Sequence, residues 1–137
     1  MKKIAVFDGQ GAGLGISFIK ALRQSANSAA IIALGSNTYA TAKMVRAGAT
    51  VGISGEKGFI AFCRRKPIDC IVAPITVIEP GTLGGEVTRA MAHAFIDLTC
   101  KKYLIPLRRE TIIIPGTSEL AIKSCIAAIV DDICRLL

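Results

Sequence analysis

The stretch that decides the fold is Ile4-Ala-Val-Phe-Asp8, followed by Gly9-Gln-Gly-Ala-Gly-Leu-Gly15. It opens with a short apolar run typical of a buried strand, and a helical pattern runs from about Leu14 to Gln24. Glycines between a strand and a helix allow positive φ and close approach of a ligand to the backbone. The first turn of the helix also offers backbone amides to an anion. The stretch therefore predicts a strand, a ligand-binding glycine turn and a helix.

Apolar strand patterns and amphipathic helix patterns alternate along the rest of the chain, with short connections and no linker or repeat. Strands are expected at 30–34, 50–53, 69–73, 103–107 and 111–114, and helices at about 37–46, 56–65, 86–98 and from Thr117 or Ser118 onward. Such alternation implies right-handed crossovers. The sequence therefore predicts one α/β domain over residues 1–137, with a doubly wound, mostly parallel, five- or six-stranded Rossmann-like sheet.

Composition restricts the setting of the protein. The N-terminal apolar run is too short for a signal peptide, and no run approaches the length of a membrane span. The five cysteines lack Cys-x-x-Cys spacing and indicate free thiols in a reducing compartment. No carboxylate or cysteine lies at metal-ligand spacing from His93, the one histidine, so no metal centre is expected. We therefore expect a cytoplasmic protein without membrane association.

The net charge of +7 points to an acidic partner or ligand. The basic residues cluster at the ends of predicted elements, and no aromatic residues are interleaved with them. A nucleic-acid surface would combine the two, so the pattern argues against nucleic acid as a partner. It favours an anionic small molecule, and the wide apolar stripe of the last helix favours a homo-oligomer. The basic clusters are 64–66, 101–102 and 108–109.

Candidate ligand-binding residues lie at the carboxyl ends of several predicted strands, where sheets of this kind bind ligands. The glycine turn is the first group, and Gly35 to Thr38 after the second strand would take a ribose or a second phosphate. Thr82 in the loop after the fourth strand and Arg108 after the fifth could reach the same ligand. Asp8 and Glu86 are candidates for acid or base roles. The turn and the second group comprise Gly9, Gln10, Gly11, Ala12, Gly13, Leu14, Gly15, Gly35, Ser36, Asn37 and Thr38.

The glycine turn resembles the cofactor turn of short-chain dehydrogenases, since Gly9, Gly13 and Gly15 match G-x-x-x-G-x-G. The resemblance implies an NAD(P) or related nucleotide cofactor. The second strand, however, ends in Leu34-Gly-Ser-Asn37 without the acidic residue that usually binds the ribose hydroxyls. Tyr39 and Lys43 spell that family's Tyr-x-x-x-Lys pair but follow the wrong strand, so we expect no catalytic role for them.

The middle of the chain resembles methylglyoxal synthase-like domains, which bind phosphate. Ala33-Leu-Gly-Ser-Asn-Thr38 and Ser54-Gly55 are similar to their two phosphate loops. The resemblance implies phosphate contacts for Gly35, Ser36, Ser54 and Gly55. Glu56 stands near the place where the synthase has its catalytic Asp, so the lyase reaction itself is not expected.

Over its whole length the sequence resembles a small bacterial family of uncharacterised Rossmann-like domains. The matching segments are the Asp8-Gly-Gln-Gly start, Ala33-Leu-Gly35 and Ile105-Pro-Leu107. That resemblance implies the fold and a cytoplasmic setting but no activity. Three functions remain open: a nucleotide-binding or dinucleotide-binding module, regulatory or part of an assembly; a small enzyme acting on a phosphorylated metabolite; and a structural homo-oligomeric subunit.

Overall fold

The computed structural model describes residues 2–65, 67–117 and 120–136. Its core is a single five-stranded sheet in the order β3-β2-β1-β4-β5, and every neighbouring pair of strands is parallel. The strands are β1 (Lys3–Asp8), β2 (Ala30–Gly35), β3 (Val51–Ser54), β4 (Cys70–Pro74) and β5 (Lys101–Ile105). The predicted doubly wound α/β sheet is confirmed. The sixth strand predicted at 111–114 is not present, because these residues belong to a long irregular segment without a strand partner.

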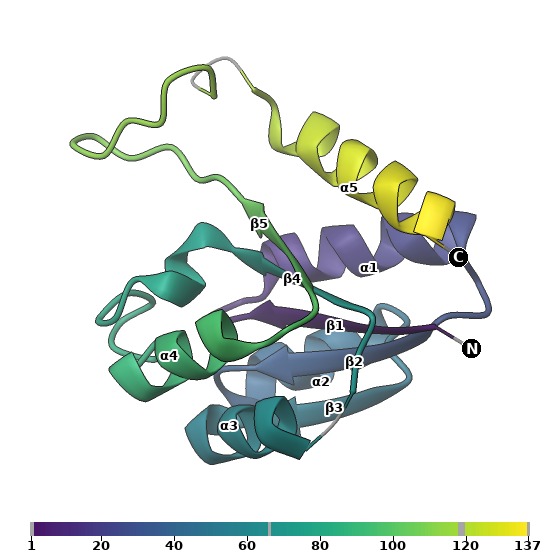
Figure 1. The fold of residues 1–137 in the computed structure, drawn as a ribbon, viewed down its shortest axis with the longest axis horizontal. Helices are drawn as coiled ribbons and strands as arrows, with labels where there is room; N and C mark the ends of the chain where they lie inside the picture. Colours follow the sequence, from purple (N-terminus) through teal and green to yellow (C-terminus); the bar gives the residue numbers. More distant parts are fainter. Residues whose placement is uncertain (1, 66, 118–119, 137) are drawn as a thin grey trace.

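Helices cover both faces of the sheet (Figure 1). The helices are α1 (Gly13–Ser25), α2 (Thr38–Arg46), α3 (Gly55–Arg65), α4 (Arg89–Asp97) and α5 (Ile122–Leu136), with a 3-10 turn, η1 (Ile75–Ile78), after β4. The helix expected to begin at Glu86 begins only at Arg89, because Thr88 caps it by accepting from the Met91 amide. Residues 118–119, one of which was a predicted cap of the last helix, lie outside the described residues.

Alternation along β1 shows why the sheet is buried on both sides. Ile4 and Val6 pack with α1, α2 and α5, whereas Ala5 and Phe7 pack with α3, α4 and η1. Successive side chains of a strand point to opposite faces, so a fully apolar strand needs cover on each. Phe7 also meets Phe59 of α3 edge-on, with ring centroids 5.1 Å apart. This central strand fixes the position of the glycine turn at the point where strand order reverses.

The carboxyl ends of all the strands point to one side of the molecule, the left in Figure 1. The loops after β1, β2 and β4 therefore begin at a common edge. The segment after β5 leaves the sheet at that edge, and residues 120–121 lead into α5. We call the described residues of this segment, 106–117 and 120–121, the arm.

Candidate functional site

The glycine turn is organised by the protein's own carboxylate, Asp8, the last residue of β1. Its Oδ1 accepts from the Gly9 amide at 2.8 Å and its Oδ2 accepts from the Gly15 amide at 2.7 Å. Ala12, the residue before α1, has φ 56° and provides no side-chain cap. Asp8 therefore takes the capping role from seven residues upstream of Gly15. The carboxylate of Asp8 thus lies at the N-terminus of α1, where the sequence pattern predicted the anion of a ligand.

Burial defines the chemistry of Asp8. Asp8 is only 5% exposed, so a ligand has little access to its side chain. Desolvation raises the pKa of the Asp8 carboxyl, while backbone hydrogen bonds from Gly15, Gly9 and Leu14 act in the opposite direction. These contacts are those of a structural cap. No oxygen of Asp8 faces a substrate in this arrangement, as the acid or base role considered for this residue would require.

Glu86 joins three separate loops at the carboxyl edge of the sheet. It comes from the loop between η1 and α4, and its Oε1 accepts from the backbone amide of Gln10 at 3.1 Å. The hydroxyl of Ser36 and the side-chain amide of Asn37 also donate to the carboxylate. These hydrogen bonds lower the pKa of Glu86, with the Ser36 hydroxyl as the largest cause. The carboxylate is therefore charged and held in place between the turns after β1 and β2.

Close packing holds the Glu86 loop against the glycine turn at Gly9. A Cβ at residue 9 would lie 2.5 Å from Leu83 Cδ1 and 3.1 Å from Glu86 Oε1, and it would also collide with the Ser36 hydroxyl. A larger residue at position 9 would therefore have to displace the side chains of Ser36, Leu83 and Glu86, which pack closely against this glycine. Leu83 itself has φ 56°, a backbone conformation that non-glycine residues rarely adopt.

Open space begins at Gly11 and Gly13, on the outer part of the same turn. A Cβ built at either residue meets no atom within 4 Å. Both glycines are exposed, and neither has a positive φ. The turn therefore has a packed half at Gly9 and Gly15 and an accessible half at 11 and 13. The accessible half borders the cluster of Gln10, Ser36, Asn37 and Glu86, which we call the Glu86 cluster.

The N-terminus of α2 adds to this edge. Asn37 caps the helix through its Oδ1, which accepts from the Ala40 amide at 2.7 Å, so one side chain serves both the helix and Glu86. Gly35 is needed because a Cβ there would lie 2.6 Å from the Thr41 amide nitrogen. Thr38 is exposed at the first turn.

Tyr39, also in the first turn of α2, is 58% exposed, and its ring carries Lys43 Nζ 4.8 Å from the centroid. Lys43 lowers the pKa of the Tyr39 hydroxyl, through a hydrogen bond first and its charge second. The Tyr-x-x-x-Lys pair is thus an exposed cation–π pair on the α2 surface.

Other predicted site residues have hydroxyls engaged elsewhere. Ser54 donates to Thr41 Oγ1 at 2.7 Å, which ties β3 to α2. Thr82 donates to the carbonyls of Glu79 and Thr76, at 2.7 and 3.0 Å, and so stabilises its own loop. Gly55 has φ 81° at the start of α3 and faces open space. Arg108 lies at the same edge of the sheet, at the start of the arm.

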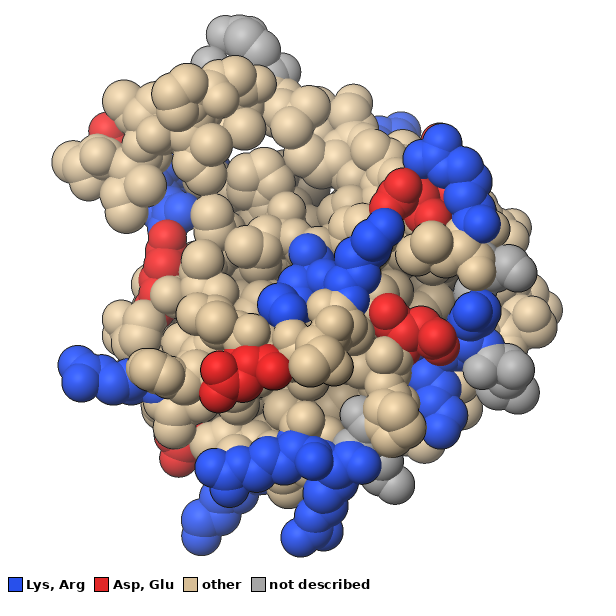
Figure 2. Space-filling model, in the orientation of Figure 1, with Lys and Arg blue, Asp and Glu red and all other residues tan. Residues whose placement is uncertain are grey.

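The arm is tied to the Glu86 loop by an ion pair that sequence patterns did not reveal. Arg109 Nη1 donates to Glu79 Oε1, and both side chains are about three-quarters buried. Residues 79 and 109 are far apart in sequence, so no spacing rule connects them. The arm encloses a hollow of about 470 Å³ against Ile122, lined mainly by its own apolar side chains. Figure 2 shows the surface hollowed where the arm meets the body.

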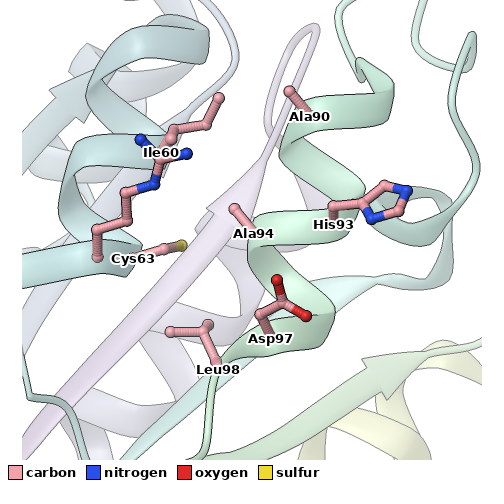
Figure 3. Close-up of a pocket in the computed structure, with 8 residues that line it drawn as sticks. Ile60, Cys63, Ala90, His93, Ala94, Asp97 and Leu98 are labelled. Carbon is pink, nitrogen blue, oxygen red and sulfur yellow. The ribbon is translucent and has the colours of Figure 1, made fainter.

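A second hollow of about 360 Å³ lies between α3 and α4, away from the glycine turn. Figure 3 shows Cys63 of α3 facing Ala94 and Asp97 of α4, while the ring of His93 points away. Burial raises the pKa of the Cys63 thiol to about 11, so it is not a thiolate at neutral pH. This groove offers neither a nucleophile nor a metal site.

Charge is distributed unevenly over the surface. In the view of Figure 2, Lys and Arg side chains gather along the lower edge of the molecule, over α3, whose last turn holds Arg64 and Arg65.

Within the described residues, no group of His, Cys, Asp or Glu could hold a metal ion. None of the described helices has the length and apolar character needed to cross a membrane.

The chain belongs to the family called Domain of unknown function (DUF3842), whose model matches residues 3–137. No curated protein matches the sequence. Among solved structures, the fold is similar to that of a dodecameric FMN-dependent UbiX-like decarboxylase from Escherichia coli O157:H7. That match has a TM-score of 0.55 and 15% sequence identity, and it covers 99% of this chain and 93% of the other. At this identity the similarity shows the fold alone.

Proposed function

We propose that this protein is a nucleotide-binding module whose ligand lies across the carboxyl edge of β1 and β2. The observation that carries the proposal is the Glu86 cluster, where three loops converge beside two glycines that face open space. A site of this kind has a backbone that a ligand can approach closely and polar groups that orient it. It borders the point of strand-order reversal, between β1 and β4, where doubly wound sheets bind their ligands.

The distribution of charge supports a position for the ligand's phosphate over the outer half of the turn. Asp8 occupies the inner half by accepting from the amides of Gly9 and Gly15. Gly11 and Gly13 leave room for a phosphate outside that carboxylate. The net charge of +7 favours an anionic ligand at long range. The FMN of the similar decarboxylase is also a phosphorylated nucleotide-type cofactor, which makes FMN a ligand to test beside NAD, NADP and mononucleotides.

The test is a thermal-shift and calorimetric screen of the purified chain with NAD, NADP, AMP, ATP, GMP and FMN. A true ligand at a hundred times its Kd stabilises the folded state by about 2.7 kcal/mol and raises the Tm accordingly. Gly13→Val is the decisive variant, because a Cβ there meets no protein atom within 4 Å and the side chain would occupy the space that we assign to the ligand. We expect it to fold normally and to lose binding at least tenfold.

Ala127→Val is the matched control, since it adds similar bulk at an exposed residue of α5. It should leave binding unchanged. Retained binding in Gly13→Val, with a normal Tm, would refute the assignment of the turn. Failure of every nucleotide to bind the wild-type chain would refute the proposed function itself.

We further propose that the module works as a homo-oligomer assembled through the arm. Ile113 is 74% exposed and Ile112 is 52% exposed, and Leu120 further along the arm is 45% exposed. A cluster of exposed large apolar side chains on a segment that stands off the body is typical of a protein–protein contact. The UbiX-like decarboxylase with a similar fold is dodecameric, which supports assembly of this fold into oligomers.

A further inference from the structure

Glu86 supplies a carboxylate at a place where the local sequence has none. In doubly wound nucleotide-binding sheets, an acidic residue near the end of the second strand accepts hydrogen bonds from the ribose hydroxyls. Here β2 ends at Gly35, and Ser36 and Asn37 follow it. Glu86, fifty residues beyond Ser36, places its carboxylate on the side chains of these two residues. The acidic group is thus present in space although it is absent from the sequence at that strand.

The hydrogen bonds leave one side of this carboxylate available. Oε1 accepts from Gln10, Ser36 and Asn37, whereas Oε2 accepts from Asn37 Nδ2 at 3.1 Å. Those are the bonds that these oxygens make among the described residues. A carboxylate oxygen has two lone-pair sites. Oε2 therefore keeps acceptor capacity while the donors on Oε1 fix its direction.

Negative charge at this edge discriminates between sugar substituents. Asp8 and Glu86 both lie against Gly9, the former bonded to its amide and the latter 3.1 Å from the position of a Cβ there. A hydroxyl can donate to such a group, whereas a phosphate ester brings a second negative charge and no donor. The two carboxylates thus favour a sugar with a free hydroxyl over a sugar phosphate ester at this edge of the sheet.

We propose that Glu86 is the residue that selects the ligand's sugar, accepting a hydrogen bond from a free ribose hydroxyl and excluding a ribose phosphate ester at that position. This inference rests on the proposed function. It assigns the module to ligands with an unmodified ribose diol, such as NAD or AMP, in preference to NADP.

The experiment compares Kd values by calorimetry for NAD against NADP and for AMP against 2′-deoxy-AMP. The wild-type chain is expected to bind NAD at least tenfold more tightly than NADP, and AMP at least fivefold more tightly than its deoxy form. In Glu86→Gln, which keeps the shape but removes the charge, the ratio of the NADP Kd to the NAD Kd should fall at least fivefold, mainly through tighter NADP binding.

Asp97→Asn is the control, because it also removes one negative charge but at the last residue of α4, the opposite end of the sheet. It should leave both ratios within twofold of wild type. Equal affinity for NAD and NADP, a preference for NADP, or an unchanged ratio in Glu86→Gln would overturn the role of Glu86.

Two outcomes separate this inference from the proposed function. Binding of FMN alone, lost in Gly13→Val, would support a nucleotide module but overturn the ribose assignment, because FMN has no ribose ring. Absence of binding by every nucleotide tested would overturn both. The wild-type comparison of AMP with 2′-deoxy-AMP needs no variant, so a folding defect in Glu86→Gln cannot hide the result.

Discussion

Asp8 illustrates how one buried residue can determine the character of a binding turn. Its carboxylate satisfies amides at both ends of the turn and so fixes the path of the backbone between Gly9 and Gly15. Buried backbone amides without an acceptor are costly, which explains why a charged residue is tolerated at 5% exposure. The result is a rigid inner turn with an open outer half.

Replacing Asp8 by Ala should therefore destabilise the fold. The change leaves the Gly9 and Gly15 amides without their acceptor, at a cost of about 2 to 4 kcal/mol. Asp8→Asn keeps one acceptor oxygen and should lose clearly less. Chemical denaturation of the variants measures both values, and equal stability of Asp8→Ala and wild type would contradict the capping role.

The same residue should give a defined pH dependence. Burial raises the pKa of Asp8 in the folded state above the value of 3.8 that it has when unfolded. Between these two values the folded state binds more protons, so the contribution of Asp8 to stability is largest below pH 3.8 and falls as the pH rises through the folded-state pKa. The free energy of unfolding of wild type relative to Asp8→Asn, measured across this range, should decrease with rising pH. The opposite slope would show that the amide hydrogen bonds outweigh burial.

At the scale of elements, α5 depends on a polar contact as well as on its apolar stripe. Ile126, Ile129 and Ile133 pack into the core beside α1. Tyr103 of β5 donates its hydroxyl to Asp132, which also pairs with Lys101 at 3.7 Å and with Arg135 at 3.1 Å. These contacts anchor the helix that follows the arm directly to the edge strand of the sheet.

Tyr103→Phe should weaken this anchor while keeping the packing of the ring. The expected loss is about 1 kcal/mol, the usual net value of one hydrogen bond. In this variant, hydrogen exchange of the backbone amides should show that α5 opens faster than α1. Unchanged protection of α5 would mean that the apolar stripe alone holds it.

At the scale of the whole molecule, the exposed apolar side chains of the arm are the feature that a monomer explains least. Three consecutive isoleucines, 112 to 114, lie exposed on it, although the core has ample apolar material. The ion pair between Arg109 and Glu79 joins the base of the arm to the Glu86 loop. Assembly through the arm would therefore adjoin the loop that completes the candidate ligand site.

Ile113→Glu should shift the protein towards monomers, because a charge at the most exposed of these side chains opposes burial in an interface. Light scattering coupled to size-exclusion chromatography measures the change. Ile96→Glu, also exposed but on α4, is the control and should keep the wild-type mass. A monomeric wild-type protein would refute assembly through the arm.

Local sequence patterns predicted the architecture because they depend on short-range physics. The apolar runs at β1, β2 and β4 are buried on both faces, and their alternation with helices allows essentially one doubly wound arrangement. The start of α2 near residue 37 was also predicted, and Asn37 caps it by accepting from the Ala40 amide, which is a local motif. The predicted strand at 111–114 was wrong, because its three isoleucines have β propensity without a partner strand.

The sequence by itself determined the sheet, the glycine turn and the edge at which we propose that a ligand binds, since each follows from neighbours along the chain. Only the tertiary structure decided how that edge is used. Asp8 caps the turn from within, Glu86 reaches the residues after β2 from a distant loop, and Arg109 meets Glu79. These contacts join segments far apart in sequence, and the close approach at Gly9 becomes visible only when the chain has folded. These polar contacts could therefore not be predicted from the sequence, because hydrogen bonds between loops leave no periodic pattern along the chain.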